Sequence, residues 1–149
     1  MDRAYYLFHN NFYEGARFYR VVENFVAQFG GSGDPLVDEH WRGLPINDEP
    51  VRTTNERGTL SFARAGARTR SFTMFINLKD NPNLDADRSQ RNVVGFPPIG
   101  RVVEGMDVVD RLFSAYGNEP MRTDLSARVL GASYPELDSI AVTSITESW

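Results

Sequence analysis

Few residue types in this sequence could carry nucleophilic or metal-dependent chemistry. The chain has no cysteine, which excludes disulfides, thiolate catalysis and cysteine-ligated zinc. Its two histidines, His9 and His40, lie far apart without ligand-like neighbours, and two ligands do not make a metal site. The glycine-rich residues 30–34 lack the Gly-Lys-Ser/Thr ending of a phosphate loop. We therefore expect no metal and no cofactor.

An arginine and a glutamine among aromatic residues are the remaining candidates. A guanidinium is permanently charged, planar and a strong donor, so Arg20 could stabilise a developing lone pair. Taken alone, an arginine between aromatic residues is more often a member of an ion pair. Phe25 and Phe75 lie on alternating segments and are more often core residues, and Gln28 could simply satisfy backbone groups. The residue types alone leave both interpretations open.

Length and composition fit a single globular domain over residues 1–149. Hydrophobic residues make up 41% and charged residues 24% of the sequence. The net charge of −4 argues against a nucleic-acid partner, because such proteins usually present a basic surface. No apolar run approaches the ~20 residues that span a bilayer, and residues 1–8 lack a signal-peptide pattern. We expect no membrane association and, by default, a cytoplasmic location.

Short apolar segments separated by turn residues predict the elements that position these side chains. Strands are expected over residues 17–22, 25–29, 59–64, 72–78, 99–103 and 140–145. Helices are expected over residues 3–10 and 105–116, the second with an apolar stripe that ends at Gly117. Polar residues 36–57 predict a long loop, and residues 118–138 an irregular excursion. Many short strands with few helices favour a barrel or a sandwich.

Three segments follow one family pattern in order along the chain. Residues 12–30 contain Y-E-G-A-R-F-Y-R-V-V and F-V-A-Q-F-G, similar to Y-x-G-x-x-F-H-R-V-x-x-x-F-M-x-Q-G-G. Residues 58–76 contain G-T-L-S-F-A-R-A-G and M-F-I, similar to G-T-L-S-M-A-R-A-G and the later Q-F-F-I. Residues 84–109 contain L-D and G-R-V-V-E-G-M-D-V-V, similar to W-L-D and F-G-R-V-x-x-G-M-D-V-V. The chain thus resembles a bacterial branch of the cyclophilin-type peptidyl-prolyl cis–trans isomerases.

The resemblance implies a mainly β fold, a closed antiparallel barrel with capping helices. Residues 3–10 then correspond to the end of the first helix, so we expect an N-terminally incomplete domain that lacks the first two strands. The last strand, over residues 140–146, would be left with an unpaired edge.

The resemblance also implies an enzyme that assists protein folding by rotating Xaa-Pro peptide bonds, without a cofactor. Arg20 matches the arginine that donates to the prolyl nitrogen, and Gln28 matches the glutamine that orients it. The positions expected to bind substrate are Phe25, Val26, Ala63, Arg64, Thr73, Phe75, Leu84 and Phe96. Expected partners are proline-containing polypeptides and, by family resemblance, cyclosporin-like ligands.

Several positions depart from the family pattern. Tyr19 replaces a histidine, Thr73 a glutamine and Asn83 a tryptophan, while Phe96 lies near the place of a second histidine. These changes predict altered specificity or a reduced rate. Two alternatives stay open, a module that binds proline-containing peptides with little catalysis, and an inactive truncated remnant. The arginines of residues 64–70 either lie in a solvated loop without a binding role or attract acidic residues of the substrate.

Overall fold

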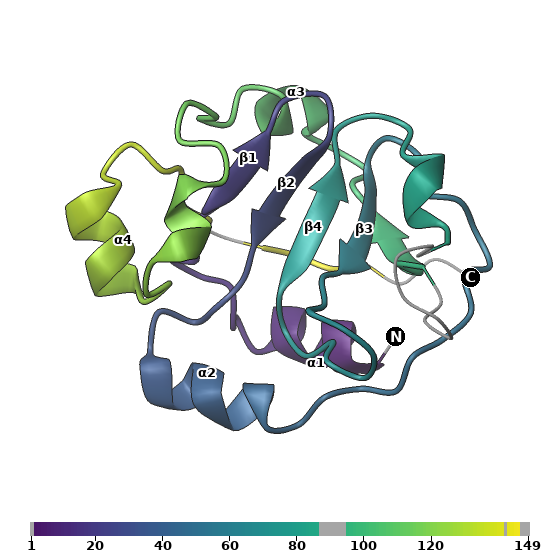
Figure 1. Cartoon of the computed structure of the whole chain (residues 1–149), viewed down its shortest axis with the longest axis horizontal. Helices are drawn as coiled ribbons and strands as arrows, with labels where there is room; N and C mark the ends of the chain where they lie inside the picture. Colours follow the sequence, from purple (N-terminus) through teal and green to yellow (C-terminus); the bar gives the residue numbers. More distant parts are fainter. Residues whose placement is uncertain (1, 87–94, 142, 147–149) are drawn as a thin grey trace.

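Five antiparallel strands form one sheet in the order β1-β2-β4-β3-β5 (Figure 1). The computed structural model describes residues 2–86, 95–141 and 143–146. The mainly antiparallel β class with a few helices is confirmed. The strands are β1 (Arg20–Val22), β2 (Val26–Phe29), β3 (Thr59–Phe62), β4 (Met74–Asn77) and β5 (Pro98–Arg101).

Alternation along the strands directs one set of side chains into the hydrophobic core. The strand residues of this core are Val21, Ala27, Phe29, Phe62, Met74 and Ile76. Helix α1 (Asp2–His9) contributes Ala4 and Leu7, and Tyr13 donates its hydroxyl to the carbonyl of Phe72 at 2.6 Å. Helices α1 and α2 lie at one end of the strands and α3 lies at the other (Figure 1).

The prediction of a continuous loop over residues 36–57 is wrong at its start, where helix α2 (Pro35–Arg42) forms. The helix has the usual signals of a helix start. The Asp34 side chain accepts a hydrogen bond from the amide of Leu36 at 2.9 Å, and Pro35 occupies the first turn. Gly43 follows the last turn. The polar composition of the segment concealed this short helix.

The predicted helix over residues 105–116 is wrong in its length, because α3 covers only Met106–Val109. The amide of Phe113 donates to the carboxylate of Asp138 at 2.7 Å. In a continuing helix that amide would bond to the carbonyl of Val109. The apolar stripe still packs as predicted, since Met106, Val109 and Leu112 contact the core.

The C-terminal part also differs from the prediction. Residues 118–138 include the 3₁₀ turn η2 (Glu119–Arg122) and helix α4 (Ala127–Ser133), which Ser126 caps. The described residues of 140–145 form no strand of the sheet, and residue 142 lies outside the description. Ser139, just before this segment, forms a bridge with Arg17. The amide of Ile140 donates to the carbonyl of Ala16 at 2.8 Å, and its carbonyl accepts from the amide of Gly15 at 2.7 Å.

Candidate active site

A row of residues crosses four neighbouring strands on the face opposite the core. Arg20 of β1 pairs with Gln28 of β2, Gln28 pairs with Phe75 of β4, and Phe75 pairs with Ser61 of β3. Paired residues of neighbouring antiparallel strands project to the same face. The sheet therefore brings together Arg20, Gln28 and Phe75, three of the residues that the sequence predicted.

The Arg20 guanidinium is held from two sides. Its Nη1 donates to Oε1 of Gln28 at 3.1 Å, and its Nε donates to Oδ1 of Asn118 at 2.6 Å. The ring centroid of Phe25 lies 5.8 Å from the guanidinium carbon. Partial burial lowers the pKa of Arg20, but an arginine stays charged at any physiological pH. The site thus contains a fixed positive donor beside an aromatic ring.

Tyr19 sets the orientation of the Gln28 amide. The amide nitrogen of Gln28 donates to the Tyr19 hydroxyl at 2.9 Å, which leaves the amide oxygen facing Arg20. Tyr19 is 3% exposed and Gln28 is 7% exposed. Burial raises the pKa of Tyr19 to about 12, so the phenol stays neutral. The family pattern predicts Tyr19 only as a replacement for a histidine, and it does not predict the contact with Gln28.

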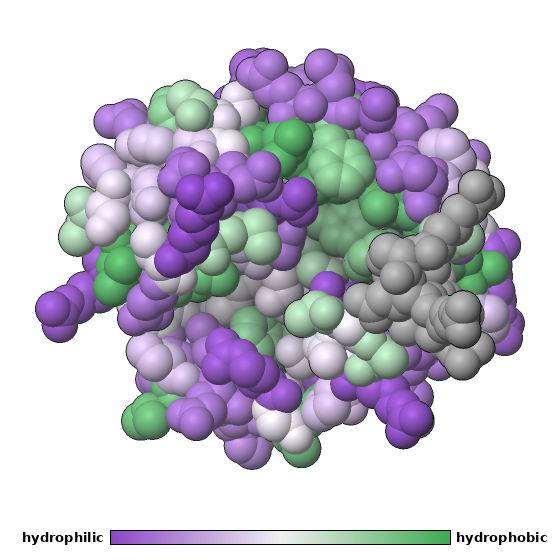
Figure 2. All heavy atoms as spheres, viewed as in Figure 1, coloured by the Kyte–Doolittle hydropathy of each residue, from purple (hydrophilic) through white to green (hydrophobic). Residues whose placement is uncertain are grey.

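An apolar cluster, which consists of Phe25, Phe75, Leu84 and Phe96, lies next to Arg20. The rings of Phe75 and Phe96 meet edge to face with centroids 5.7 Å apart. The amide of Phe96 donates to the carbonyl of Leu84 at 2.8 Å, at the end of the 3₁₀ turn η1 (Pro82–Leu84). Figure 2 shows hydrophobic surface gathered over the middle of the sheet. Phe75 is 5% exposed and Val26 is 2% exposed, which leaves little of either side chain for a ligand.

The position of Leu84 is fixed by the carboxylate that follows it. Asp85 accepts hydrogen bonds from the backbone and side-chain nitrogens of Asn55, both at 2.8 Å, and from the hydroxyl of Thr54. Burial alone would raise the pKa of Asp85, but these hydrogen bonds outweigh it and lower that pKa. Leu84 and Asp85 therefore join the apolar cluster to the hydrogen bonds that Asp85 accepts from Asn55 and Thr54.

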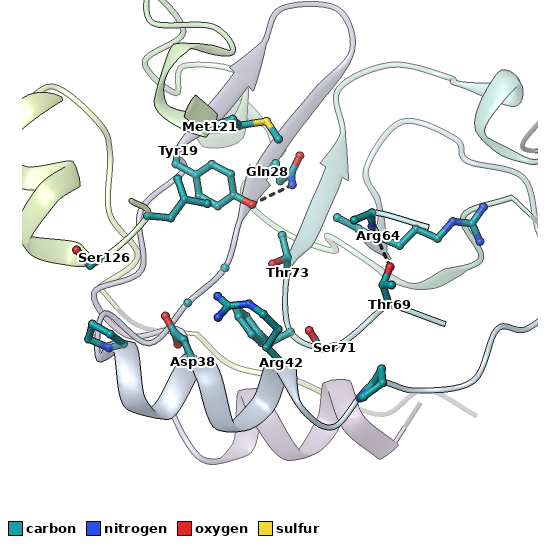
Figure 3. Close-up of a pocket in the computed structure, with 18 of the residues that line it drawn as sticks. Tyr19, Gln28, Asp38, Arg42, Arg64, Thr69, Ser71, Thr73, Met121 and Ser126 are labelled. Carbon is teal, nitrogen blue, oxygen red and sulfur yellow. Dashed lines mark hydrogen bonds between the residues drawn. The ribbon is translucent and has the colours of Figure 1, made fainter. Parts of the chain in front are cut away.

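A groove of about 670 Å³ lies next to Gln28, and Phe25, Phe75, Leu84 and Phe96 are not among its lining residues. Four predicted residues line it, namely Gln28, Ala63, Arg64 and Thr73. The opposite wall comes from helix α2, whose Asp38 and Arg42 point toward the groove (Figure 3). Tyr19 and Met121 close one end. The α2 wall could not be predicted because the helix itself was not.

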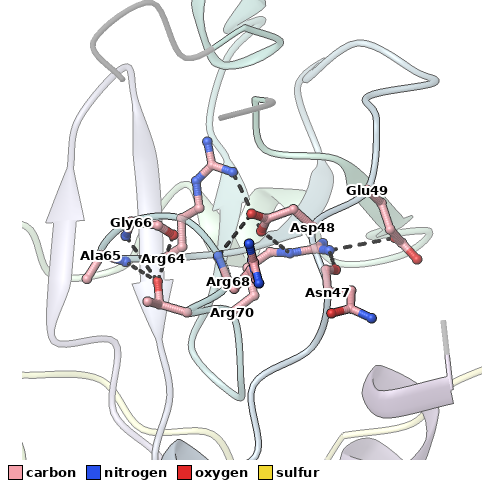
Figure 4. Close-up of polar contacts among 9 residues, drawn as sticks. Asn47, Asp48, Glu49, Arg64, Ala65, Gly66, Arg68 and Arg70 are labelled. Atoms are coloured by element: carbon pink, nitrogen blue, oxygen red, sulfur yellow. Dashed lines mark hydrogen bonds and ion pairs between the residues drawn. The ribbon is translucent and has the colours of Figure 1, made fainter. Parts of the chain in front are cut away.

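The arginines of the loop after β3 differ in exposure (Figure 4). The side chains of Arg64 and Arg70 are 2% and 1% exposed and lie near the carboxylate of Asp48. Arg68 is exposed and lines the groove. This placement favours a structural role for Arg64 and Arg70, and leaves Arg68 as the one of the three that could meet an acidic ligand.

Sequence comparison shows the family of the chain. Residues 3–131 match the family model described as cyclophilin type peptidyl-prolyl cis-trans isomerase. A peptidyl-prolyl cis-trans isomerase of Acinetobacter baylyi is 39% identical over 105 residues, which are 69% of this chain and 54% of that protein. Peptidyl-prolyl cis-trans isomerase B of Escherichia coli is 34% identical over 117 residues, covering 76% and 71% of the two chains. The chain belongs to the cyclophilin-type peptidyl-prolyl cis–trans isomerase family.

Solved structures show the same fold. A cyclophilin type peptidyl-prolyl cis-trans isomerase of Cryptosporidium parvum, crystallised in the presence of the dipeptide Ala-Pro, aligns with a TM-score of 0.56 at 20% identity. The alignment covers 76% of this chain and 72% of that one. The chain spans about half the length of the Acinetobacter baylyi relative and of isomerase A from Dickeya dadantii, at 54% and 53%.

Within residues 2–86, 95–141 and 143–146, no helix is long and apolar enough to cross a membrane. The same residues contain no group of three or more histidine, aspartate or glutamate side chains that could hold a metal ion.

Proposed function

We propose that this chain is a peptidyl-prolyl cis–trans isomerase that acts on Xaa-Pro bonds of polypeptides. The observation that carries the proposal is the position of Arg20, whose guanidinium is fixed by Gln28 and Asn118 beside the apolar cluster. Family membership and the names of the relatives support it. The dipeptide Ala-Pro in the Cryptosporidium parvum structure supports a proline-containing ligand.

The proposed mechanism needs no nucleophile and no net proton transfer. Rotation about a peptide bond has a barrier of ~18–20 kcal/mol, because the nitrogen lone pair is conjugated with the carbonyl. A catalyst must therefore bind the twisted amide more tightly than either planar form. In the twisted amide the lone pair is localised on the prolyl nitrogen, and Arg20 would donate a hydrogen bond to it.

The apolar cluster would hold the proline ring. Phe25, Leu84 and Phe96 are half-buried and would offer the hydrophobic surface, while Phe75 and Val26 are buried. With the ring held, the other side of the bond is free to turn, and Gln28 would keep Arg20 aimed at the nitrogen. The same cluster is the proposed binding site of cyclosporin-like ligands.

The groove would receive the residues that precede proline. Ala63 and Arg64 form one of its walls, and their backbone follows strand β3, so an extended substrate could pair with it. Thr73 lies in the groove where the family has a longer glutamine. This shorter side chain, together with Asn83 in place of a tryptophan, predicts weaker substrate binding than in relatives with the full pattern.

The test is a protease-coupled or NMR exchange assay on a short Xaa-Pro peptide with the wild type and Arg20→Ala. We expect turnover that Arg20→Ala reduces at least ~100-fold, the usual scale of a lost electrostatic donor, while cooperative unfolding persists. Phe25→Ala and Phe75→Ala should chiefly weaken peptide binding. A folded wild type without turnover would contradict the proposal.

A module that binds proline-containing peptides is the second candidate function. Thr73 favours it, because a short hydroxyl in the groove cannot reach as far as an amide to hold the substrate backbone in a twisted state. In that case peptides would bind to the wild type and to Arg20→Ala with equal affinity, and neither protein would catalyse exchange.

We also propose that the sheet belongs to a closed barrel of the cyclophilin type. The pairing of residues 138–140 with residues 15–18, next to the start of β1, supports a sheet that continues beyond its first strand. Hydrogen-exchange protection of the Phe18 and Ile140 amides, comparable to that of β2, would test this pairing.

A further inference from the structure

The carboxylate of Asp48 lies at the centre of the arginine loop (Figure 4). Its Oδ2 accepts a hydrogen bond from the backbone amide of Arg68 at 2.9 Å. Its Oδ1 lies 3.7 Å from Nε of Arg70 and 4.0 Å from Nη1 of Arg64. The backbone contact fixes the carboxylate, and the free oxygen faces two guanidinium groups that are almost completely buried.

Arg64 connects this carboxylate with the apolar cluster. Its guanidinium carbon lies 4.7 Å from the ring centroid of Phe96, within the range of a cation–π contact. The Phe96 ring in turn packs edge to face on Phe75. A guanidinium at 2% exposure has little contact with water, so its charge interacts strongly with both the ring and the carboxylate.

We infer that Asp48 is a positioning residue of the site, which holds Arg64 over Phe96 and thereby fixes the Phe96 wall of the proposed proline pocket. The inference rests on the proposed isomerase function. Asp48 acts through Arg64 and touches no reacting atom. Without the charge of Asp48, Arg64 loses an anionic neighbour at 4.0 Å, and the guanidinium can shift away from the Phe96 ring.

Glu49 is a matched control on the same loop. Its carboxylate lies 3.9 Å from Arg70 and is 57% exposed. Glu49→Gln and Asp48→Asn each remove one negative charge beside the buried Arg70. Asp48→Asn also removes the carboxylate that lies 4.0 Å from Arg64. When Asp48 is neutral, Glu49 still lies beside Arg70, which helps the variant to fold.

The kinetic experiment measures kcat and KM of the full chain on a short Xaa-Pro peptide. Asp48→Asn should raise KM about fivefold, which corresponds to a partial loss of about 1 kcal/mol from a cation–π contact, with kcat changed less than about twofold. Glu49→Gln should leave both unchanged. Asp48→Glu should recover part of the loss. Equal effects of Asp48→Asn and Glu49→Gln would overturn the inference.

A double-mutant cycle separates positioning from general stability. Arg64→Met keeps the Asp48–Arg70 pair and therefore folds even if Asp48→Asn does not. It should raise KM as Asp48→Asn does, and adding Asp48→Asn to it should change KM no further. Additive effects of the two substitutions on KM would contradict a path through Arg64.

Two readouts keep this inference separate from the isomerase proposal. The dissociation constant of the peptide tests the Phe96 wall even when the wild type shows no turnover. Absence of turnover would contradict only the isomerase proposal. NMR of the phenylalanine rings in the free protein needs neither activity nor binding. Asp48→Asn should shift the Phe96 ring resonances and Glu49→Gln should not, and unchanged Phe96 resonances in Asp48→Asn would overturn the inference.

Discussion

Arg20 and Asn118 lie 98 positions apart in the sequence, and their side chains are joined by a hydrogen bond of 2.6 Å from the guanidinium Nε to the amide Oδ1. Asn118 precedes the short turn η2, which packs against β1. The proposed catalytic donor is therefore held by a segment that the family motifs do not include.

Removing the Asn118 amide should loosen Arg20 without unfolding the protein. Asn118 is exposed, so we expect a modest effect, with kcat for Xaa-Pro exchange falling about two- to fivefold in Asn118→Ala. Glu119→Ala is the control, because the side chain of Glu119 forms a surface ion pair with Arg122, which contributes little to stability. Equal kcat values in the two variants would show that Asn118 does not position Arg20.

The Tyr19 hydroxyl should matter for activity, and the comparable hydroxyl of Tyr13 should not. Tyr19→Phe keeps the ring but leaves the Gln28 amide nitrogen without its acceptor, so the amide can turn away from Arg20. Tyr13→Phe removes a buried hydrogen bond to Phe72, and both residues belong to the hydrophobic core. Each variant should lose about 1 kcal/mol of unfolding free energy. Only Tyr19→Phe should lower kcat/KM, by about three- to tenfold.

Both buried tyrosines predict that stability declines in alkali. Burial raises the pKa of Tyr19 to about 12 and raises that of Tyr13 well above its usual value. The unfolded chain releases these protons near pH 10, whereas the folded protein retains them. The resulting stabilisation is fully present below about pH 10 and is lost as the pH rises toward 12.

Urea unfolding followed at several pH values between about 8 and 12 checks this expectation. The midpoint should fall more steeply for the wild type than for Tyr19→Phe, which keeps only the contribution of Tyr13. Identical slopes for the two proteins would mean that Tyr19 does not retain its proton in the folded state.

The central strands and the heart of the site could be predicted because their determinants are local. Alternating apolar residues indicated β1 to β4, and one hairpin places Arg20 opposite Gln28. Asn118, Asp48 and the end of α3 could not be predicted in this way. Each depends on a contact between segments far apart in sequence. For example, the Phe113 amide donates to the carboxylate of Asp138 in place of a helical carbonyl, so the helix does not continue.

Helix α2 shows a different limit. The sequence contains the helix signals Asp34, Pro35 and Gly43, but the polar composition of residues 36–57 led to the prediction of a loop. A helix of eight residues gains little from its own hydrogen bonds and depends on contacts made after folding. Trp41 supplies such a contact, since its ring meets that of Phe12 in an edge-on arrangement.

Gly95 should tolerate no side chain, because it brings Phe96 against Leu84. A Cβ at residue 95 would lie 2.3 Å from the backbone carbonyl group of Asp85, closer than any real contact. Gly95→Ala must therefore push the two segments apart and break the hydrogen bond from the Phe96 amide to the Leu84 carbonyl. We expect a loss of about 2 kcal/mol or more in unfolding free energy and weaker peptide binding. Gly100→Ala on β5 is the control, since its Cβ would meet nothing within 4 Å. If Gly95→Ala unfolds and binds peptide as Gly100→Ala does, the close approach of these two segments does not shape the site.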